Sequence, residues 1–383
     1  MKTVVIVLNT SWNIYNFRLN LMKALRTKGF NVIALAPYDE YSDKLQEAGF
    51  EWVHLPLDND STNPLKELFQ IRSFYKIYKE ISPDIILQYT VKPNLYGTFA
   101  AQLLKIPVIN NISGLGTVFV KDKLVYKVAR GMYRLVLRFP QKVFFQNRHD
   151  HALFLQQKLV KAHLSDVIPG SGIDVSRFVP IPYPKENEDS VKFLMIARLI
   201  KDKGLIEYIE AIKVLKKRYT NVTFQLIGSL YEGNPSSISK DILDSWIKDD
   251  LIEYLSFSDK MEEIISKVDC VVLPSYREGL SRVLLEAASM AKPIVTTDVA
   301  GCKDVVDDGV NGFLCKVKDV PSLVEAMEKI IALKPEQLEE MSRKGREKIV
   351  SEFDEKIVIN KYLYEVENIL NQECHVNKKL KSL

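Results

Sequence analysis

Two glutamates in the second half of the chain have a spacing and a setting suited to binding a polar ligand. Glu278 and Glu286 lie in the segment 277–293, directly after the apolar run 270–274. From Leu280 onwards the apolar residues recur at helical spacing, which predicts an amphipathic helix. The two acids are a little over two helical turns apart, so both could lean toward one side. The alternative is a solvated pair of glutamates on the polar face of a helix.

The predicted start of that helix could bind an anion. Gly279 would let the backbone approach a ligand closely, and the free N–H groups at a helix start attract negative charge. Gly279, Leu280 and Ser281 are therefore candidate ligand-binding residues. Two acids beside such a helix start suit a ligand that carries both hydroxyls and phosphates, and a sugar nucleotide is one.

Two basic residues earlier in the same half could hold a diphosphate. Arg198 ends the predicted strand 191–197, and Lys203 opens the predicted helix 203–218. A guanidinium fork and an ammonium point charge are both suited to phosphate, although a solvated basic turn is the alternative. The loop 227–235, with Gly228 and Asn234, follows the predicted strand 221–228, where contacts to a base or ribose are expected.

Apolar strands alternate with helices along the whole chain, which predicts an α/β protein with two doubly wound parallel sheets. Ligands bind beyond the carboxyl ends of such strands, so residues 9–11, 90–92 and 113–117 are further candidates. The polar, proline-rich stretch 180–190 predicts a linker between a first domain, 1–182, and a second, 191–353. The remainder, 354–383, begins with a predicted helix.

Length and composition limit the class of protein. A chain of 383 residues should form two domains, and none of its apolar runs reaches the ~18 residues that a transmembrane helix needs. Its four cysteines show no metal-like spacing, which predicts a reducing compartment. His149 and His151 lack further ligands at suitable spacing, so no metal site is predicted. A Gly-x-Gly-x-x-Gly motif is absent, which argues against a dinucleotide-binding dehydrogenase.

Positive charge is concentrated in the first half. Residues 1–185 contain 24 Lys and Arg against 14 Asp and Glu, a net charge of +10, whereas the remainder has a net charge of −6. Part of the excess lies in a predicted amphipathic helix within 121–142, where five cations share one stripe: Lys123, Lys127, Arg130, Arg134 and Arg138. Such a helix fits an anionic bilayer surface; a packed helix with a solvated basic face is the alternative.

Together these features resemble the retaining glycosyltransferases of family four, which have the GT-B fold. The Glu-x(7)-Glu motif of that family matches Glu278 and Glu286, and its phosphate-binding Arg and Lys match Arg198 and Lys203. The resemblance covers essentially the full chain. Within the family the chain looks most like bacterial N-acetylgalactosaminyltransferases that extend an undecaprenyl-diphosphate-linked sugar, and the matching stretches include 14–18, 114–116, 234–236 and 273–276.

The resemblance implies two Rossmann-like domains that face each other across a cleft, the first for the acceptor and the second for the donor. The C-terminal helix would cross back to the first domain. Arg198, Lys203 and Glu278 would be catalytic, with Glu278 on the donor sugar; Glu286 would bind the ribose. Ser11, Arg18 and Lys92 would face the acceptor.

The implied reaction moves an N-acetylhexosamine, such as GalNAc, from a UDP-sugar to a lipid-diphosphate-linked saccharide. It would need no metal or other cofactor and no nucleic acid. The enzyme would be peripheral, on the cytoplasmic face of the inner membrane, and serve surface polysaccharide or glycoprotein glycan synthesis. A UDP-sugar 2-epimerase of the same architecture and a non-catalytic sugar-nucleotide-binding protein are the alternatives.

Overall fold

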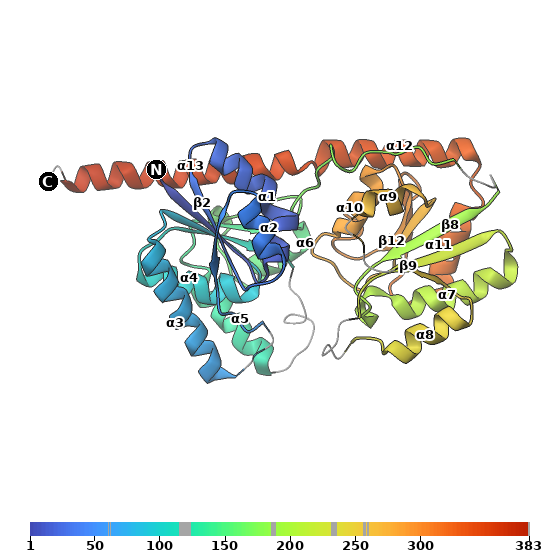
Figure 1. Cartoon of the computed structure of the whole chain (residues 1–383), viewed down its shortest axis with the longest axis horizontal. Coiled ribbons are helices and arrows are strands. Elements are labelled where there is room, and N and C mark those ends of the chain that lie inside the picture. The colour runs from blue at the N-terminus through green and yellow to red at the C-terminus, as the bar shows by residue number, and fades with distance from the viewer. Residues whose placement is uncertain are drawn as a thin grey trace. The chain divides into compact units, whose positions relative to one another are not determined.

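The chain divides into two compact units, each built on a parallel sheet (Figure 1). The computed structural model describes residues 1–59, 61, 63–114, 124–184, 189–230, 236–255, 258 and 260–381. One unit comprises Met1–Ser171 and Lys356–Leu383, and the other comprises Gly172–Glu355. The predicted fold class, two doubly wound parallel sheets, is confirmed.

The sheet of the first unit has seven parallel strands in the order β3-β2-β1-β4-β5-β6-β7. The strands are β1 (Thr3–Val7), β2 (Asn31–Ala36), β3 (Glu51–His54), β4 (Ile85–Tyr89), β5 (Val108–Ile112), β6 (Lys142–Phe145) and β7 (Ser165–Val167). The helices are α1 (Ser11–Thr27), α2 (Tyr41–Glu47), α3 (Pro64–Ile81), α4 (Thr98–Leu103), α5 (Leu124–Val136) and α6 (Arg148–Gln156), with a π-helical turn at Pro93–Gly97.

Both faces of this sheet are buried at its centre, which explains why a central strand such as β1 is almost continuously apolar. Successive residues of β1 belong to different cores: Val4 and Ile6 pack on one face, and Val5 and Val7 pack on the other. Because side chains alternate between the faces of a strand, an apolar residue is needed at every position. The sequence missed β7, which has only three residues, two of them polar.

The second unit repeats the design with six parallel strands in the order β10-β9-β8-β11-β12-β13. They are β8 (Val191–Ile196), β9 (Val222–Ile227), β10 (Glu253–Leu255), β11 (Cys270–Leu273), β12 (Ile294–Thr297) and β13 (Gly312–Cys315). Its helices are α7 (Leu205–Arg218), α8 (Lys240–Lys248), α9 (Met261–Ser266), α10 (Arg282–Ser289), α11 (Val320–Ile331) and α12 (Pro335–Glu352).

The boundary between the units lies about ten residues before the predicted linker, at Gly172. The segment 172–182, which was predicted to end the first domain, joins the second. Ile173 pairs with Asp354, and Phe178, 2% exposed, lies in the core of the second unit. Arg346 holds this segment through a hydrogen bond of 2.6 Å from its Nη1 to the carbonyl oxygen of Phe178. The predicted boundary differs because proline and charge mark the exposed stretch that begins at residue 180. The packing contacts that assign 172–178 to the second unit involve residues distant in the chain.

The last helix, α13 (Glu355–Lys381), belongs to the first unit from its second residue, Lys356, onwards. Figure 1 shows this long helix beside the sheet that contains the N-terminus. Val358, Tyr362, Val366 and Ile369 recur at helical spacing and are buried in the core that includes β1, β2 and β4. The Tyr362 hydroxyl also accepts a hydrogen bond of 3.0 Å from Nδ2 of Asn111 in β5. Among the described residues, no helix combines the length and apolarity needed to cross a membrane.

We expect Tyr362→Ala to lower the free energy of unfolding of the first unit by about 3 kcal/mol, because it removes a fully buried aromatic ring. Tyr364 is a matched control on the same helix, 67% exposed, where Tyr364→Ala should stay within about 0.5 kcal/mol of the wild type. Hydrogen exchange of the β1 and β4 amides in urea reports this unit alone. Equal effects at the two positions would contradict the assigned packing of α13.

Candidate functional site

The strands that carry the predicted ligand-binding residues flank the point where the second sheet reverses its order. The strands β8 and β11 are hydrogen-bonded neighbours at the centre of this sheet, although they are far apart in sequence. The chain moves outward from β8 in one direction and from β11 in the other. Ligands of doubly wound sheets bind beyond the carboxyl ends of such a strand pair. Arg198 and Lys203 follow β8, and Glu278 follows β11.

Lys203 and Glu278 form an ion pair at this position. Nζ of Lys203 lies 2.5 Å from Oε1 of Glu278, and the two side chains are 18% and 13% exposed. The sequence assigned these residues to different parts of one ligand but did not predict that they touch. An ammonium and a carboxylate in contact offer hydrogen-bond donors and acceptors side by side at the expected ligand position.

The loops after β8 and β11 lie against each other through backbone contacts. The amide of Tyr276 donates to the carbonyl oxygen of Asp202 at 2.9 Å. Gly204 has φ of +76°, and a Cβ there would lie 2.1 Å from the carbonyl oxygen of Pro274. Any larger residue would force the loops apart, so this glycine keeps Lys203 within reach of Glu278.

A third loop, after β12, fixes the backbone on the other side of Glu278. The amide of Glu278 donates to the carbonyl of Ala300 at 3.3 Å, and that of Ser281 donates to Gly301 at 3.2 Å. These bonds hold residues 278–281 outside the helix, and α10 begins only at Arg282. The sequence placed the start of this helix at residues 279–281, slightly too early, so the helical spacing between Glu278 and Glu286 does not apply. Gly279, Leu280 and Ser281 instead lead into the first turn of α10, whose N–H groups suit an anion.

Glu286 lies in a different environment from Glu278. Its carboxylate accepts a hydrogen bond of 3.0 Å from Nε of Arg282, one helical turn earlier, and its side chain is 13% exposed. Burial raises the pKa of Glu286, and the charges of Arg282 and Arg177 oppose that rise. Arg177 in turn pairs with Glu262, and that bond is the main cause that raises the pKa of Arg177.

The sequence analysis missed both arginines near Glu286. Arg282 stands at the i, i+4 spacing of a helical ion pair, so it could have been found. Arg177 could not, because it is more than one hundred residues from Glu286 in the chain.

Two family models match the two units. The model described as glycosyl transferases group 1 matches residues 182–348, and the model described as glycosyl transferase 4-like matches residues 4–147. The chain is also 30% identical to the N,N'-diacetylbacillosaminyl-diphospho-undecaprenol alpha-1,3-N-acetylgalactosaminyltransferase of Campylobacter jejuni, over 92% of this chain and 94% of the relative. The chain belongs to this family of glycosyltransferases.

A second relative is also a glycosyltransferase, and a solved structure has a similar fold. The UDP-Gal:alpha-D-GlcNAc-diphosphoundecaprenol alpha-1,3-galactosyltransferase of Escherichia coli is 24% identical over 83% of each chain. Among solved structures, HepE of Anabaena in complex with UDP and glucose is similar in fold, with a TM-score of 0.78 and 18% identity over 96% of this chain and 100% of that one.

The remaining donor-side predictions for the glycosyltransferase fall on the same edge of the second sheet. Arg198 is exposed directly after β8. Gly228 follows β9, and a Cβ there would lie 1.8 Å from the carbonyl oxygen of Ala197, so only glycine allows this approach. Asn234 lies outside the described residues. The structure thus brings Arg198, Lys203, Gly228 and Glu278 to the carboxyl ends of neighbouring strands.

Two predicted acceptor-side residues of the glycosyltransferase are fully occupied by protein partners. The Ser11 hydroxyl donates to the carbonyl of Pro37 and accepts from Ser42 and from Nε1 of Trp52, each at 2.9 Å. Nζ of Lys92 donates to the carbonyl oxygens of Asp58 and Ser61 and to Glu67. These contacts use every hydrogen-bonding position of both groups. Neither residue is therefore retained as a ligand contact.

Arg18 is different, because its buried guanidinium is not fully satisfied. It is 4% exposed on the inner face of α1, with Cζ 4.1 Å from the ring centre of Tyr89 at the end of β4. Its Nη1 donates to the carbonyl of Phe17 at 3.1 Å, whereas Nε has no partner among the described residues. β4 neighbours β1 where the first sheet reverses its order, so Arg18 lies beneath the expected ligand position of that sheet.

The predicted basic helix of the glycosyltransferase is present as α5, where Lys127 and Arg134 are exposed and Arg130 is half-buried. Arg138 is exposed just after it, and Lys123 lies outside the described residues. No group of three or more His, Cys, Asp or Glu placed to hold a metal occurs in the part of the chain that the structure describes.

The raised pKa of Glu286 predicts a pH-dependent stability. Because burial raises the pKa above its ordinary value of 4.5, the folded state holds its proton to a higher pH than the unfolded state. As pH rises from the unfolded-state pKa through the folded-state pKa, the wild type loses stability relative to Glu286→Gln. A tenfold difference in proton affinity between the two states corresponds to a loss of about 1.4 kcal/mol.

Hydrogen exchange of the β8 and β11 amides in urea, over the acidic range, measures this difference. Glu339→Gln at an exposed position is the control and should run parallel to the wild type. A wild-type curve parallel to that of Glu286→Gln would contradict the assigned burial of Glu286.

Proposed function

We propose that this enzyme transfers an N-acetylhexosamine, such as GalNAc, from a UDP-sugar to an undecaprenyl-diphosphate-linked saccharide, with retention of configuration. The observation that carries the donor side is the contact of 2.5 Å between Lys203 and Glu278 where the second sheet reverses its order. The lipid-linked acceptor is supported by the names of the relatives from Campylobacter jejuni and Escherichia coli.

The donor bond breaks between the anomeric carbon of the sugar and the oxygen of the diphosphate. The electron pair leaves with the diphosphate, and Arg198, Lys203 and the N–H groups at the start of α10 stabilise the charge that develops. The acceptor hydroxyl forms the new bond on the same face of the sugar and gives its proton to the departing diphosphate. Cations supplied by the chain would thus replace a metal ion.

Each glutamate has a separate role in this proposal. Glu278 accepts hydrogen bonds from hydroxyls of the donor sugar, since Lys203 beside it marks the adjoining phosphate. Glu286 accepts hydrogen bonds from the ribose hydroxyls, and Arg282 favours its charged, accepting form by pairing with it at 3.0 Å.

Arg18 is the acceptor-side residue that we retain. A guanidinium removed from water without a balancing anion costs several kcal/mol. A phosphate of the lipid diphosphate would supply that anion and accept from the unpartnered Nε. Stacking on Tyr89 would meanwhile fix the plane of the guanidinium.

The basic helix α5 would face the membrane that holds this acceptor, on the cytoplasmic side. Its exposed cations Lys127 and Arg134, with Arg138 after it, would be drawn to anionic lipid. Val128 and Leu135 on the same helix are 56% and 53% exposed, and their apolar side chains would enter the lipid interface.

Arg198→Ala and Lys203→Ala should each lower turnover about 10²- to 10³-fold, because each removes charge stabilisation from the leaving diphosphate. Turnover is measured by mass spectrometry, with a panel of UDP-sugars and a polyprenyl-diphosphate-linked saccharide. Lys201→Ala, an exposed lysine in the same turn, is the matched control. Addition of EDTA should leave turnover unchanged.

Near-normal turnover of a folded Lys203→Ala protein would rule out the phosphate role, and a loss with EDTA that magnesium restores would rule out the metal-free mechanism. The same assay without acceptor distinguishes a transferase from an epimerase, since an epimerase would convert the donor sugar. A sugar-nucleotide-binding protein would bind UDP and transfer nothing.

Arg18→Met should raise KM for the lipid-linked acceptor about tenfold or more while UDP affinity stays the same, because a charged hydrogen bond is lost on one side only. Arg26→Met, on the exposed face of the same helix, is the control. Steady-state kinetics with varied acceptor measure the effect. A change confined to UDP binding would contradict the acceptor-side role.

A further inference from the structure

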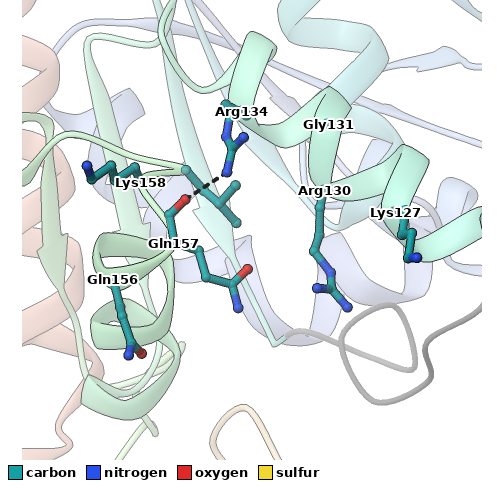
Figure 2. Close-up of a pocket in the computed structure, with 8 residues that line it drawn as sticks. Lys127, Arg130, Gly131, Arg134, Gln156, Gln157 and Lys158 are labelled. Atoms are coloured by element: carbon teal, nitrogen blue, oxygen red, sulfur yellow. Dashed lines mark hydrogen bonds between the residues drawn. The ribbon is translucent and has the colours of Figure 1, made fainter.

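The first unit contains a basic cavity that the proposed reaction does not use. Its volume is about 580 Å³, and it lies between α5 and the end of α6. Figure 2 shows Lys127 and Arg130 extending from α5 on one side, with Gln156 and Lys158 on the other. The residues that line it are Lys127, Arg130, Gly131, Arg134, Gln156, Gln157, Lys158 and Leu159.

The described residues that line this cavity carry charge of one sign. Four of them are Lys or Arg, and none of them is Asp or Glu. Lys127, Arg130 and Arg134 follow one another at helical spacings of three and four, where like charges destabilise a helix by about 0.2–0.5 kcal/mol per pair. An anion placed among them would add attractions that offset these repulsions.

The cavity also has hydrogen-bond donors held in place. Nη2 of Arg134 donates to the backbone carbonyl of Gln157 at 3.1 Å, which fixes its guanidinium at the cavity wall (Figure 2). A guanidinium has five N–H donors, so others remain for a ligand, and the side-chain amides of Gln156 and Gln157 can add more. Fixed donors of this kind favour the oxygens of a phosphate over a diffuse counterion layer.

We propose that this cavity binds the phosphate-bearing headgroup of an anionic membrane lipid. The inference deepens the membrane-facing role proposed for α5 and rests on it. The phosphate would lie among Lys127, Arg130, Arg134 and Lys158, separate from the acceptor diphosphate at Arg18. One bound headgroup would thereby fix the orientation of this unit on the bilayer.

Apolar residues next to the cavity favour a lipid over a free phosphate. Val128 and Leu135, on α5 and directly after the cavity-lining residues Lys127 and Arg134, are 56% and 53% exposed. A soluble anion would make no use of them, whereas a headgroup seated in the cavity would bring its acyl chains to the same surface. Cationic and apolar groups would then meet different parts of one ligand.

Gly131 permits a test that leaves every charge in place. It lines the cavity, and a Cβ added there would meet nothing within 4 Å. A longer neutral side chain would therefore extend into open space, and Gln is a good helix former. Gly131→Gln should place a side chain in the cavity and obstruct it with the helix intact, and Gly131→Ala is the matched control for helix propensity.

The experiment measures partition of the full chain onto phosphatidylcholine vesicles with and without phosphatidylglycerol, by flotation. We expect Gly131→Gln to weaken binding to the anionic vesicles about tenfold or more, because bonds to a charged phosphate are lost. Gly131→Ala should match the wild type. Arg138→Gln, which removes a charge outside the cavity, should weaken binding only about fivefold, as for any cation near the surface.

The outcomes separate this inference from the proposed function. Equal binding by Gly131→Gln and the wild type would overturn the headgroup site while the membrane-facing role stands. Failure of the wild type to bind anionic vesicles would overturn both. A calorimetric titration with inorganic phosphate is the second arm. If Gly131→Gln abolishes the binding of free phosphate but this variant binds anionic vesicles normally, the ligand is a soluble anion and the lipid assignment is overturned.

Discussion

The close approach of three backbone loops is the constraint on which the donor site depends. Glycines stand where these loops meet: a Cβ at Gly204 would lie 2.1 Å from the carbonyl oxygen of Pro274, and one at Gly301 would lie 2.5 Å from that of Glu278. Both glycines have positive φ, so an L-residue would be strained there as well as crowded. The loops follow adjacent strands, so their close packing brings Lys203, after β8, into contact with Glu278, after β11.

The same packing gives the two glutamates different chemical properties. Glu278 sits on a loop held by the β12 connection and lies in contact with the ammonium of Lys203. Glu286 sits on α10 in a buried setting that raises its pKa, and Arg282 and Arg177 oppose the rise. A motif that looks symmetrical in sequence is therefore asymmetric in the fold. This difference supports separate partners for the two acids.

The sequence was sufficient for the fold class because both faces of each sheet are covered, so the central strands are mostly apolar and stand out in the sequence. The sequence was also sufficient to place Arg198, Lys203 and Glu278, since each follows a predicted strand and therefore lies at the carboxyl end of that strand. It could not supply the Lys203–Glu278 contact or the position of Arg177, which depend on strand order and on packing between distant segments. The sequence predicted that Ser11 and Lys92 bind the acceptor. It could not show that partners from other loops occupy the hydrogen-bonding positions of both side chains.

Positive charge occurs in two settings in the first unit, and each makes different demands on a ligand. The cations of α5 are mostly solvated, so water and salt screen them and their repulsion costs little. Arg18 is buried against Tyr89, so its charge is poorly screened and needs an anion at a defined point. A buried cation therefore suits recognition of one substrate group, whereas a solvated set suits attraction to a surface. The cavity beside α5 lies between these limits. It is open to solvent, but the guanidinium of Arg134 in its wall is held by a hydrogen bond to Gln157, a setting that suits an exchangeable lipid headgroup.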